Sequence, residues 1–182
     1  MSDLPDLNGK RVAIIATDFF EESELTTPRD ELAKAGADVR VYAPHTGTLQ
    51  AMSGDTDKTI TVDVDGTLDE LDPSSFDAVV VPGGTVNADH LRTEERAQQI
   101  VKDVLASGRP LAAICHAPWL LVSAGLVEGK RLTSFPSLSV DVRNAGGEWV
   151  DETVVVDGNL ITSRNPDDLP AFVGAIADAL TA

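Results

Sequence analysis

Short apolar segments alternate with longer amphipathic segments along almost the whole chain, and this alternation constrains the fold more than any other feature. The apolar runs are bounded by polar or glycine-containing turns, as is typical of buried strands. The longer segments carry apolar residues at helical spacing, and several stop at a glycine. The sequence therefore predicts strands at 11–16, 38–43, 76–81 and 111–114, an exposed edge strand at 58–62, a hairpin of 154–156 with 160–163, and helices at 22–35, 93–107, 116–124 and 168–180.

Strands that alternate with helices predict a mainly parallel sheet covered by helices on both faces. In such sheets the ligand site lies beyond the carboxyl ends of the strands. Three segments occupy that position: the loop after Ala16, the Gly83-Gly84 pair and Cys115. We therefore expect an α/β fold whose site is built from these segments.

Composition limits the class of protein. The chain has 182 residues, one cysteine and a formal net charge of −16, which suits one domain and excludes an intrachain disulfide. No apolar run approaches the ~20 residues of a membrane helix, and the first residues do not resemble a signal peptide, so we expect a cytoplasmic protein. The negative charge argues against nucleic acid and anionic membranes as partners. It fits either a GC-rich genome or a salt-adapted cytoplasm, where salt screens repulsion between carboxylates.

Cys115 is the sharpest candidate for chemistry. It stands between a buried apolar strand and the start of a helix, the setting of a nucleophile elbow. A helix N-terminus near the sulfur favours the thiolate, although a lone cysteine is as often a small buried apolar residue. His116 follows directly and is a candidate base or acid, or a histidine that merely lines a loop. His45 and His90 lack metal-ligand spacing with His116, so we expect no metal.

Two further groups lie at the same edge of the predicted sheet. Gly83 and Gly84 let the backbone approach a ligand closely and aim an N–H group at it, or they simply form a tight turn. The chain has no phosphate-binding or dinucleotide-binding glycine motif, so no cofactor is expected. Glu21, Glu22 and Glu24 crowd the start of the first helix, where acids are favourable caps. One of them is also a candidate to project into the site.

Together these motifs resemble a known family. Ala-Ile-Cys-His-Ala-Pro at 113–118, Val-Pro-Gly-Gly at 81–84, Phe-Glu-Glu-Ser-Glu-Leu at 20–25 and the segment 163–170 look like the ThiJ/PfpI superfamily, in its branch of PfpI-type intracellular proteases and protein deglycases. The resemblance runs from about Arg11 to Leu180. It implies a flavodoxin-like three-layer sandwich, related to class I glutamine amidotransferases, as a single domain over 1–182 with an N-terminal tail at 1–9.

The resemblance also implies roles for individual residues. Cys115 matches the nucleophile, His116 its neighbouring histidine, and Glu21 the glutamate that hydrogen-bonds the cysteine. Backbone groups of Gly84 and His116 match the oxyanion hole. Asp89, in the loop after Gly84, is the best match, with a one-residue offset, for a carboxylate that a neighbouring subunit supplies to a Cys–His–acid triad. A homodimer or a larger homo-oligomer is therefore expected.

Two departures from the family pattern bear on function. Ala117 stands where the family usually has glycine, and no histidine follows His116, which argues against amidotransfer from glutamine. The expected reaction is attack of the Cys115 thiolate on a carbonyl, with either small peptides or glyoxal and methylglyoxal adducts as substrates and with Glu21 and His116 moving protons. The side chains of Trp119 and Phe20 are candidates to line the substrate pocket. The alternative is that both belong to the hydrophobic core. The alternative to an enzyme is a redox-responsive stress protein whose cysteine is oxidised rather than catalytic. A third hypothesis, a chaperone that holds unfolded proteins, is not supported, because the sequence has no large apolar stretch.

Overall fold

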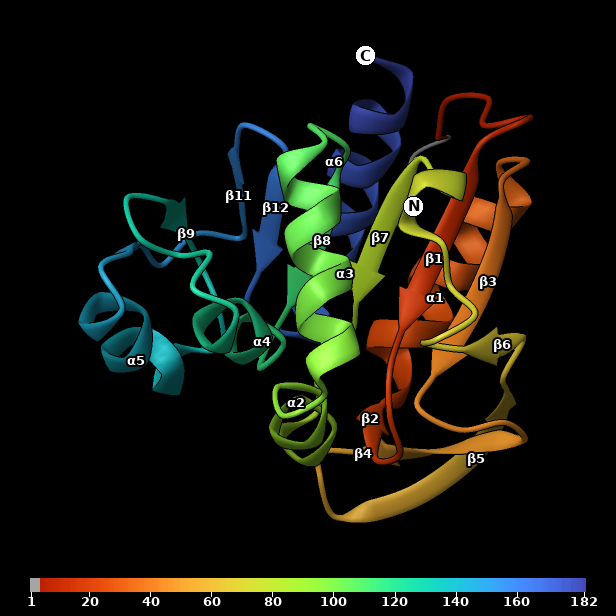
Figure 1. Cartoon of the computed structure of the whole chain (residues 1–182), viewed down its shortest axis with the longest axis horizontal. Helices are drawn as coiled ribbons and strands as arrows, with labels where there is room; N and C mark the ends of the chain where they lie inside the picture. The colour runs from red at the N-terminus through yellow and green to blue at the C-terminus, as the bar shows by residue number, and fades with distance from the viewer. Residues whose placement is uncertain (1–3) are drawn as a thin grey trace.

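The computed structural model describes residues 4–182 and is built around a seven-stranded sheet (Figure 1). The strand order is β11-β12-β8-β7-β1-β3-β6, and every neighbouring pair is parallel except β11 with β12. The strands are β1 (Arg11–Ile15), β3 (Asp38–Ala43), β6 (Gly66–Thr67), β7 (Ala78–Val81), β8 (Leu111–Ile114), β11 (Val154–Asp157) and β12 (Leu160–Ser163). The predicted mainly parallel sheet and its closing hairpin are confirmed.

Helices cover both faces of the sheet. The face drawn behind the sheet in Figure 1 carries α1 (Glu22–Lys34) and α6 (Leu169–Thr181), which contact each other. The face drawn in front carries α3 (Glu95–Ala106), with α2 (Thr85–Leu91) and α4 (Pro118–Ser123) beside it.

Alternate residues of a central strand serve the two layers. Val12 and Ile14 of β1 join the core under α1 and α6, whereas Ala13 and Ile15 join the core under α3. Successive side chains of a strand point to opposite faces, so a strand covered on both sides must be apolar throughout. This is why β7 and β8 consist only of apolar residues and are fully buried.

Smaller elements surround the sheet. A three-stranded sheet of β2 (Phe20–Glu21), β4 (Thr48–Ser53) and β5 (Asp57–Asp63) lies at the end of the central sheet where β1 and β7 finish (Figure 1). The exposed strand expected at 58–62 is β5, the edge of this small sheet. The remaining elements are β9 (Arg131–Leu132), β10 (Glu148–Trp149), α5 (Ser139–Asn144) and the 3-10 turns η1 (Pro73–Ser75), η2 (Pro136–Leu138) and η3 (Pro166–Asp168).

Two helix starts differ from the sequence prediction by two residues each, and that of α6 differs by one. The helix expected from Thr93 begins at Glu95, because Glu94 has an extended backbone that separates α3 from the short α2. The helix expected from His116 begins at Pro118, because the chain first turns through Cys115. Both shifts place extra loop residues at the carboxyl edge of the sheet.

The expected N-terminal tail, 1–9, lies partly outside the described residues, which begin at residue 4. Within it, Leu7 is fully buried and its N–H donates to the carbonyl of Ala35 at 2.8 Å. Across residues 4–182, none of the helices has the length and apolar character needed to cross a membrane.

Candidate active site

Cys115 stands on a strained turn directly after β8. Its φ of +63° lies in the left-handed region, which non-glycine residues rarely adopt. Its N–H donates to the carbonyl of Ser163 at 3.1 Å, and its own carbonyl accepts the N–H of Phe135 at 2.8 Å. These bonds hold the turn, which lifts the sulfur above the carboxyl edge of the sheet while leaving the residue only 7% exposed. The geometry is that of the predicted nucleophile elbow.

Glu24 is the carboxyl group beside the sulfur. It is fully buried, its Oε2 accepts the N–H of Gly83 at 2.9 Å, and it lies close enough to the Cys115 thiol for each group to shift the pKa of the other. Its other oxygen, Oε1, is buried without a hydrogen-bond partner among the described residues. A Cβ on Gly83 would lie 2.4 Å from the Glu24 carboxylate and 2.6 Å from Cys115 Cβ. Gly83 is therefore required for close approach, as the Gly-Gly motif suggested.

Burial is the largest influence on the pKa values of Glu24 and Cys115. It raises the pKa of Glu24 to about 8. It also raises the pKa of the Cys115 thiol, and the negative charge of Glu24 adds to that effect. The backbone N–H groups of Gly84 and His116 act on the sulfur in the opposite sense and lower its pKa. The expected bias of Cys115 toward the thiolate is therefore wrong for the resting site, because desolvation outweighs these donors.

The structure assigns the cysteine contact to Glu24 and not to Glu21. The Glu21 carboxylate instead accepts the N–H of Gly54 at 2.9 Å on the rim of the site. Burial raises the pKa of Glu21, against the lowering effect of the Gly54 bond, and the charges of Asp55 and Glu22 raise it further. Glu21 precedes the helix, whereas Glu24 lies in the first turn of α1, on the buried side that also carries Leu25, Pro28 and Leu32. That spacing is the sequence signal that identifies Glu24.

His116 lies against the cysteine. Its Nδ1 is 3.2 Å from Cys115 Sγ. The ring stacks on Phe135, with 4.7 Å between ring centroids, and Trp119 meets it edge-on at 5.4 Å. Burial lowers the pKa of His116, and the charge of Asp55 opposes this. Aromatic contacts therefore hold the His116 ring at the sulfur, and the lowered pKa favours its neutral form.

These groups open into one cleft of about 410 Å³. It lies at the carboxyl ends of the strands, as the parallel sheet predicts. The two aromatic residues considered as pocket walls do not line it: Phe20 is fully buried in the core, and Trp119 stands behind His116. The lining residues are Glu21, Glu24, Gly54, Asp55, Gly84, Thr85, Cys115, His116, Phe135 and Pro166.

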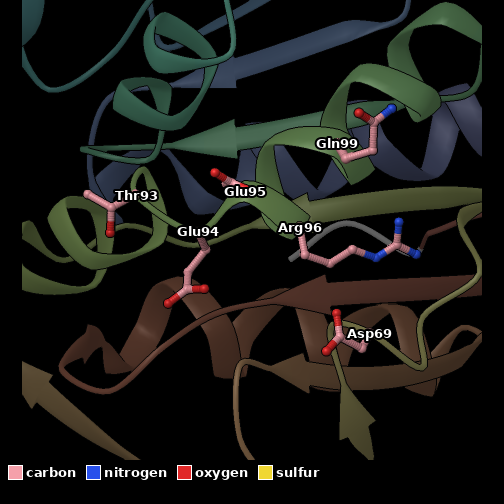
Figure 2. A pocket seen from close by; sticks show the side chains of 6 residues that line it. All are labelled: Asp69, Thr93, Glu94, Glu95, Arg96 and Gln99. Atoms are coloured by element: carbon pink, nitrogen blue, oxygen red, sulfur yellow. The ribbon is translucent and has the colours of Figure 1, made fainter.

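A second hollow, of about 710 Å³, has a different character (Figure 2). It is lined by Asp69, Thr93, Glu94, Glu95, Arg96 and Gln99, so it contains neither the cysteine nor a histidine. Arg96 is engaged within the protein, because its guanidinium donates to the carbonyls of Leu68 and Leu71 at 3.1 and 2.6 Å. This hollow is lined by the first part of α3, the residues just before it and the segment after β6. None of the candidate catalytic residues lines it.

The remaining candidate residues lie apart from the cleft. Asp89 is exposed on α2 rather than in a loop, and it does not line the cleft of this chain. His45 is exposed and lies 3.3 Å from Asp18. Among the residues described here, no three His, Cys, Asp or Glu side chains come together in a group that could hold a metal ion.

Comparison with known proteins agrees with this geometry. The model of the DJ-1/PfpI family matches residues 10–179. Protein/nucleic acid deglycase 2 of Escherichia coli is 44% identical over 165 residues, which is 90% of this chain and 93% of the relative. A deglycase of Pyrococcus abyssi is 42% identical over 163 residues, 90% of this chain and 95% of the relative.

A solved two-domain protein of Anabaena variabilis, with DJ-1/ThiJ/PfpI-like and ferritin-like domains, has a TM-score of 0.88 and 37% identity. The match covers 94% of this chain and 48% of that protein, so the chain spans about half of its length. The alternating layers around the parallel sheet are thus the flavodoxin-like sandwich that these relatives share. The chain belongs to the DJ-1/PfpI family.

Proposed function

We propose that this protein is a cysteine-dependent enzyme that repairs or removes small glyoxal-derived carbonyl compounds. The observation that carries the proposal is the contact of 3.2 Å between Cys115 Sγ and His116 Nδ1, beside the buried carboxyl of Glu24. A thiol is a strong nucleophile once deprotonated, and an adjacent neutral histidine can accept its proton. The deglycase names of the two relatives support the same class of substrate.

The reaction follows from the positions of these groups. The Cys115 thiol gives its proton to His116 as the sulfur adds to the aldehyde carbon of methylglyoxal. The oxygen of the adduct lies toward the N–H groups of Gly84 and His116, which serve as the oxyanion hole. Glu24, which is neutral at rest, gives its proton to the oxygen on the neighbouring carbon. Its carboxylate then carries the proton of the former aldehyde carbon to that neighbouring carbon, so that the hemithioacetal becomes a thioester. Water hydrolyses the thioester, which releases lactate and the free thiol, and no external oxidant is needed.

The cleft favours small carbonyl compounds over peptides. Its volume is about 410 Å³, and Cys115 is only 7% exposed, so an extended peptide backbone would have difficulty reaching the sulfur. Glu21 and Asp55 on its lining, together with the chain's net charge of −16, favour neutral or cationic adducts over those on nucleic acid. We therefore place adducts on the amino and guanidino groups of amino acids and proteins ahead of nucleotide adducts.

Parallel assays test this assignment. Purified protein is given methylglyoxal, a methylglyoxal adduct of N-acetyl-arginine and a fluorogenic peptide, and lactate or fluorescence is measured. Cys115→Ser and Cys115→Ala should lower turnover of the carbonyl substrates roughly 100-fold or more while far-UV circular dichroism stays unchanged. Wild-type rates in these variants would contradict the proposal, and turnover of the peptide alone would make the protein a peptidase.

A second candidate, a redox-responsive protein, is favoured by one observation. Glu24, with a pKa of about 8, is largely protonated at neutral pH and can donate a hydrogen bond to an oxidised sulfur. Mild peroxide should then add two oxygens to Cys115, visible in the intact mass. Oxidation without any Cys115-dependent turnover would favour this second function over the enzyme.

We propose one domain over 1–182, a reducing cytoplasm suited to the free thiol, and a homodimer or larger homo-oligomer. If Asp89 serves the site of a neighbouring subunit, mixing Asp89→Ala with Cys115→Ala protein should restore part of the activity through hybrid interfaces. A light-scattering mass equal to one chain would contradict a shared site.

A further inference from the structure

The far side of the His116 ring faces a hydroxyl group and then a carboxylate. His116 Nε2 lies 3.5 Å from Thr85 Oγ1. The Thr85 hydroxyl donates to Asp55 Oδ2 at 2.6 Å, and the Thr85 N–H donates to Asp55 Oδ1 at 2.9 Å. Thr85 is thus held by both oxygens of one carboxylate, with its hydroxyl between that carboxylate and the histidine.

The direction of these hydrogen bonds determines where the imidazole proton lies. A threonine hydroxyl has one hydrogen, and here the carboxylate takes it. Thr85 Oγ1 therefore has only lone pairs to offer His116, so the contact requires a hydrogen on Nε2. In a neutral imidazole the other nitrogen, Nδ1, is then the acceptor. Nδ1 is the atom that lies 3.2 Å from the Cys115 sulfur.

We propose that Asp55, acting through Thr85, is a positioning residue that fixes the tautomer and orientation of His116, so that one chain holds a Cys115–His116–Thr85–Asp55 relay. Its consequence for catalysis rests on the function proposed above. When His116 takes the thiol proton, both ring nitrogens become donors, and the Nε2–H still has its acceptor. The negative charge of the Asp55 carboxylate also stabilises the positive charge that forms on the imidazole ring.

The turn that carries Asp55 is shaped for this contact. Asp55 lies between β4 and β5 with φ of +64°, in the left-handed region, next to Gly54 with φ of +62°. Glu21 holds the turn from the opposite side by accepting the Gly54 N–H. Backbone strain at a non-glycine residue persists where surrounding contacts impose it, and it is concentrated at functional sites. The two hydrogen bonds to Thr85 and the bond to Glu21 are such contacts.

The relay assigns to Asp55 of the same chain the part that the family resemblance gives to Asp89 of a neighbour. Asp55 lines the cleft, whereas Asp89 of this chain does not. The other carboxyl groups near the relay are Glu21 and Glu24. Glu21 accepts the N–H of Gly54 and Glu24 accepts the N–H of Gly83, so Asp55 is the carboxylate with a hydroxyl bridge to His116.

The tautomer of His116 is measured by long-range ¹H–¹⁵N NMR of ¹⁵N-histidine-labelled protein, assigned with His45→Gln and His90→Gln. The wild type should show Nε2–H and unprotonated Nδ1. Thr85→Val replaces the hydroxyl with a methyl group and should abolish this preference, whereas Thr85→Ser keeps the hydroxyl and should retain it. Asp55→Asn should weaken it, because an amide carbonyl is a poorer acceptor than a carboxylate.

Kinetics on the carbonyl substrate provide the second measurement. Thr85→Val should lower kcat roughly 10- to 100-fold with little change in KM, and Thr85→Ser should recover most of that loss. Asp72→Asn is the control, because the Asp72 carboxylate also accepts the N–H and the hydroxyl of one residue, Ser74, although both on Oδ1, in a turn outside the cleft. It should leave both the tautomer and the rate unchanged.

The two measurements separate failure of the relay from failure of the proposed function. An Nδ1–H tautomer in the wild type, or equal spectra and rates for Thr85→Val and Thr85→Ser, would overturn the relay. A correct tautomer response without turnover of any carbonyl substrate would leave the relay standing and reject the proposed function.

Discussion

Replacing Glu24 with glutamine tests whether the buried carboxyl beside Cys115 is neutral in the folded protein. Burial raises its pKa from 4.5 to about 8. Between these two pH values the folded state holds a proton that the unfolded state has released. The stability contributed by the neutral carboxyl is therefore complete below pH 4.5 and is lost as the pH rises toward about 8.

The size of this change in stability follows from the difference between the two pKa values, 4.5 and about 8. Each pH unit within it lowers the free energy of unfolding by about 1.4 kcal/mol, so the interval from 4.5 to about 8 amounts to about 5 kcal/mol. This is an upper limit, because the Cys115 thiol shares the proton. Glutamine is neutral throughout, and its oxygen can still accept the Gly83 N–H. Stability of Glu24→Gln relative to wild type should therefore rise steadily between about pH 5 and about pH 8, by at most about 4 kcal/mol.

Urea unfolding followed by tryptophan fluorescence measures this difference at several pH values. Glu22→Gln is the control, because it removes one negative charge from the same helix at a partly exposed position away from Cys115. Its effect is subtracted at each pH. A difference between Glu24→Gln and wild type that stays constant from about pH 5 to about pH 8 would refute the raised pKa.

Further predictions concern backbone fit around the sulfur. Gly83→Ala should destabilise the fold by roughly 1–3 kcal/mol and reduce turnover, because its Cβ would collide with Glu24 and Cys115. Gly174→Ala, within α6 where a Cβ meets nothing within 4 Å, should instead stabilise by about 0.5–1 kcal/mol, and thermal unfolding compares the two. Cys115→Gly should be more stable than Cys115→Ala by roughly 1 kcal/mol, because glycine adopts a positive φ without strain; equal denaturation midpoints would contradict this.

The central sheet was predictable because its strands are buried on both faces. Such strands are continuously apolar, and their turns carry glycine or proline, so their positions along the chain and the converging carboxyl ends could be inferred without coordinates. Cys115 and Gly84 were found in this way, from their place immediately after strands. Thr48–Ser53 was missed because β4 belongs to a small sheet and mixes polar with apolar residues.

The inward position of Glu24 and the contact between Thr85 and Asp55 are hard to predict from local sequence patterns. Glu21 and Glu24 both suit a helix N-terminus, and the spacing of Glu24 from Pro28 and Leu32 separates them only once the buried face of α1 is known. Asp55 and Thr85 are 30 residues apart, and their contact depends on how the β4–β5 hairpin folds back over the cleft. A long-range polar contact of this kind leaves no periodic signal in the sequence.

The β4–β5 hairpin supports the site with one strand that belongs to the core and one that is mostly exposed. In β5 only Val62 is buried, whereas β4 pairs with β2 and places Leu49 and Ala51 in the core that also contains Val12. A segment with few buried apolar contacts opens locally at lower free energy than a central strand. Amide hydrogens of β5 should therefore exchange faster than those of β1, and mild denaturant should release Asp55 from Thr85 first. Inactivation on heating would then precede global unfolding, with the central sheet still intact.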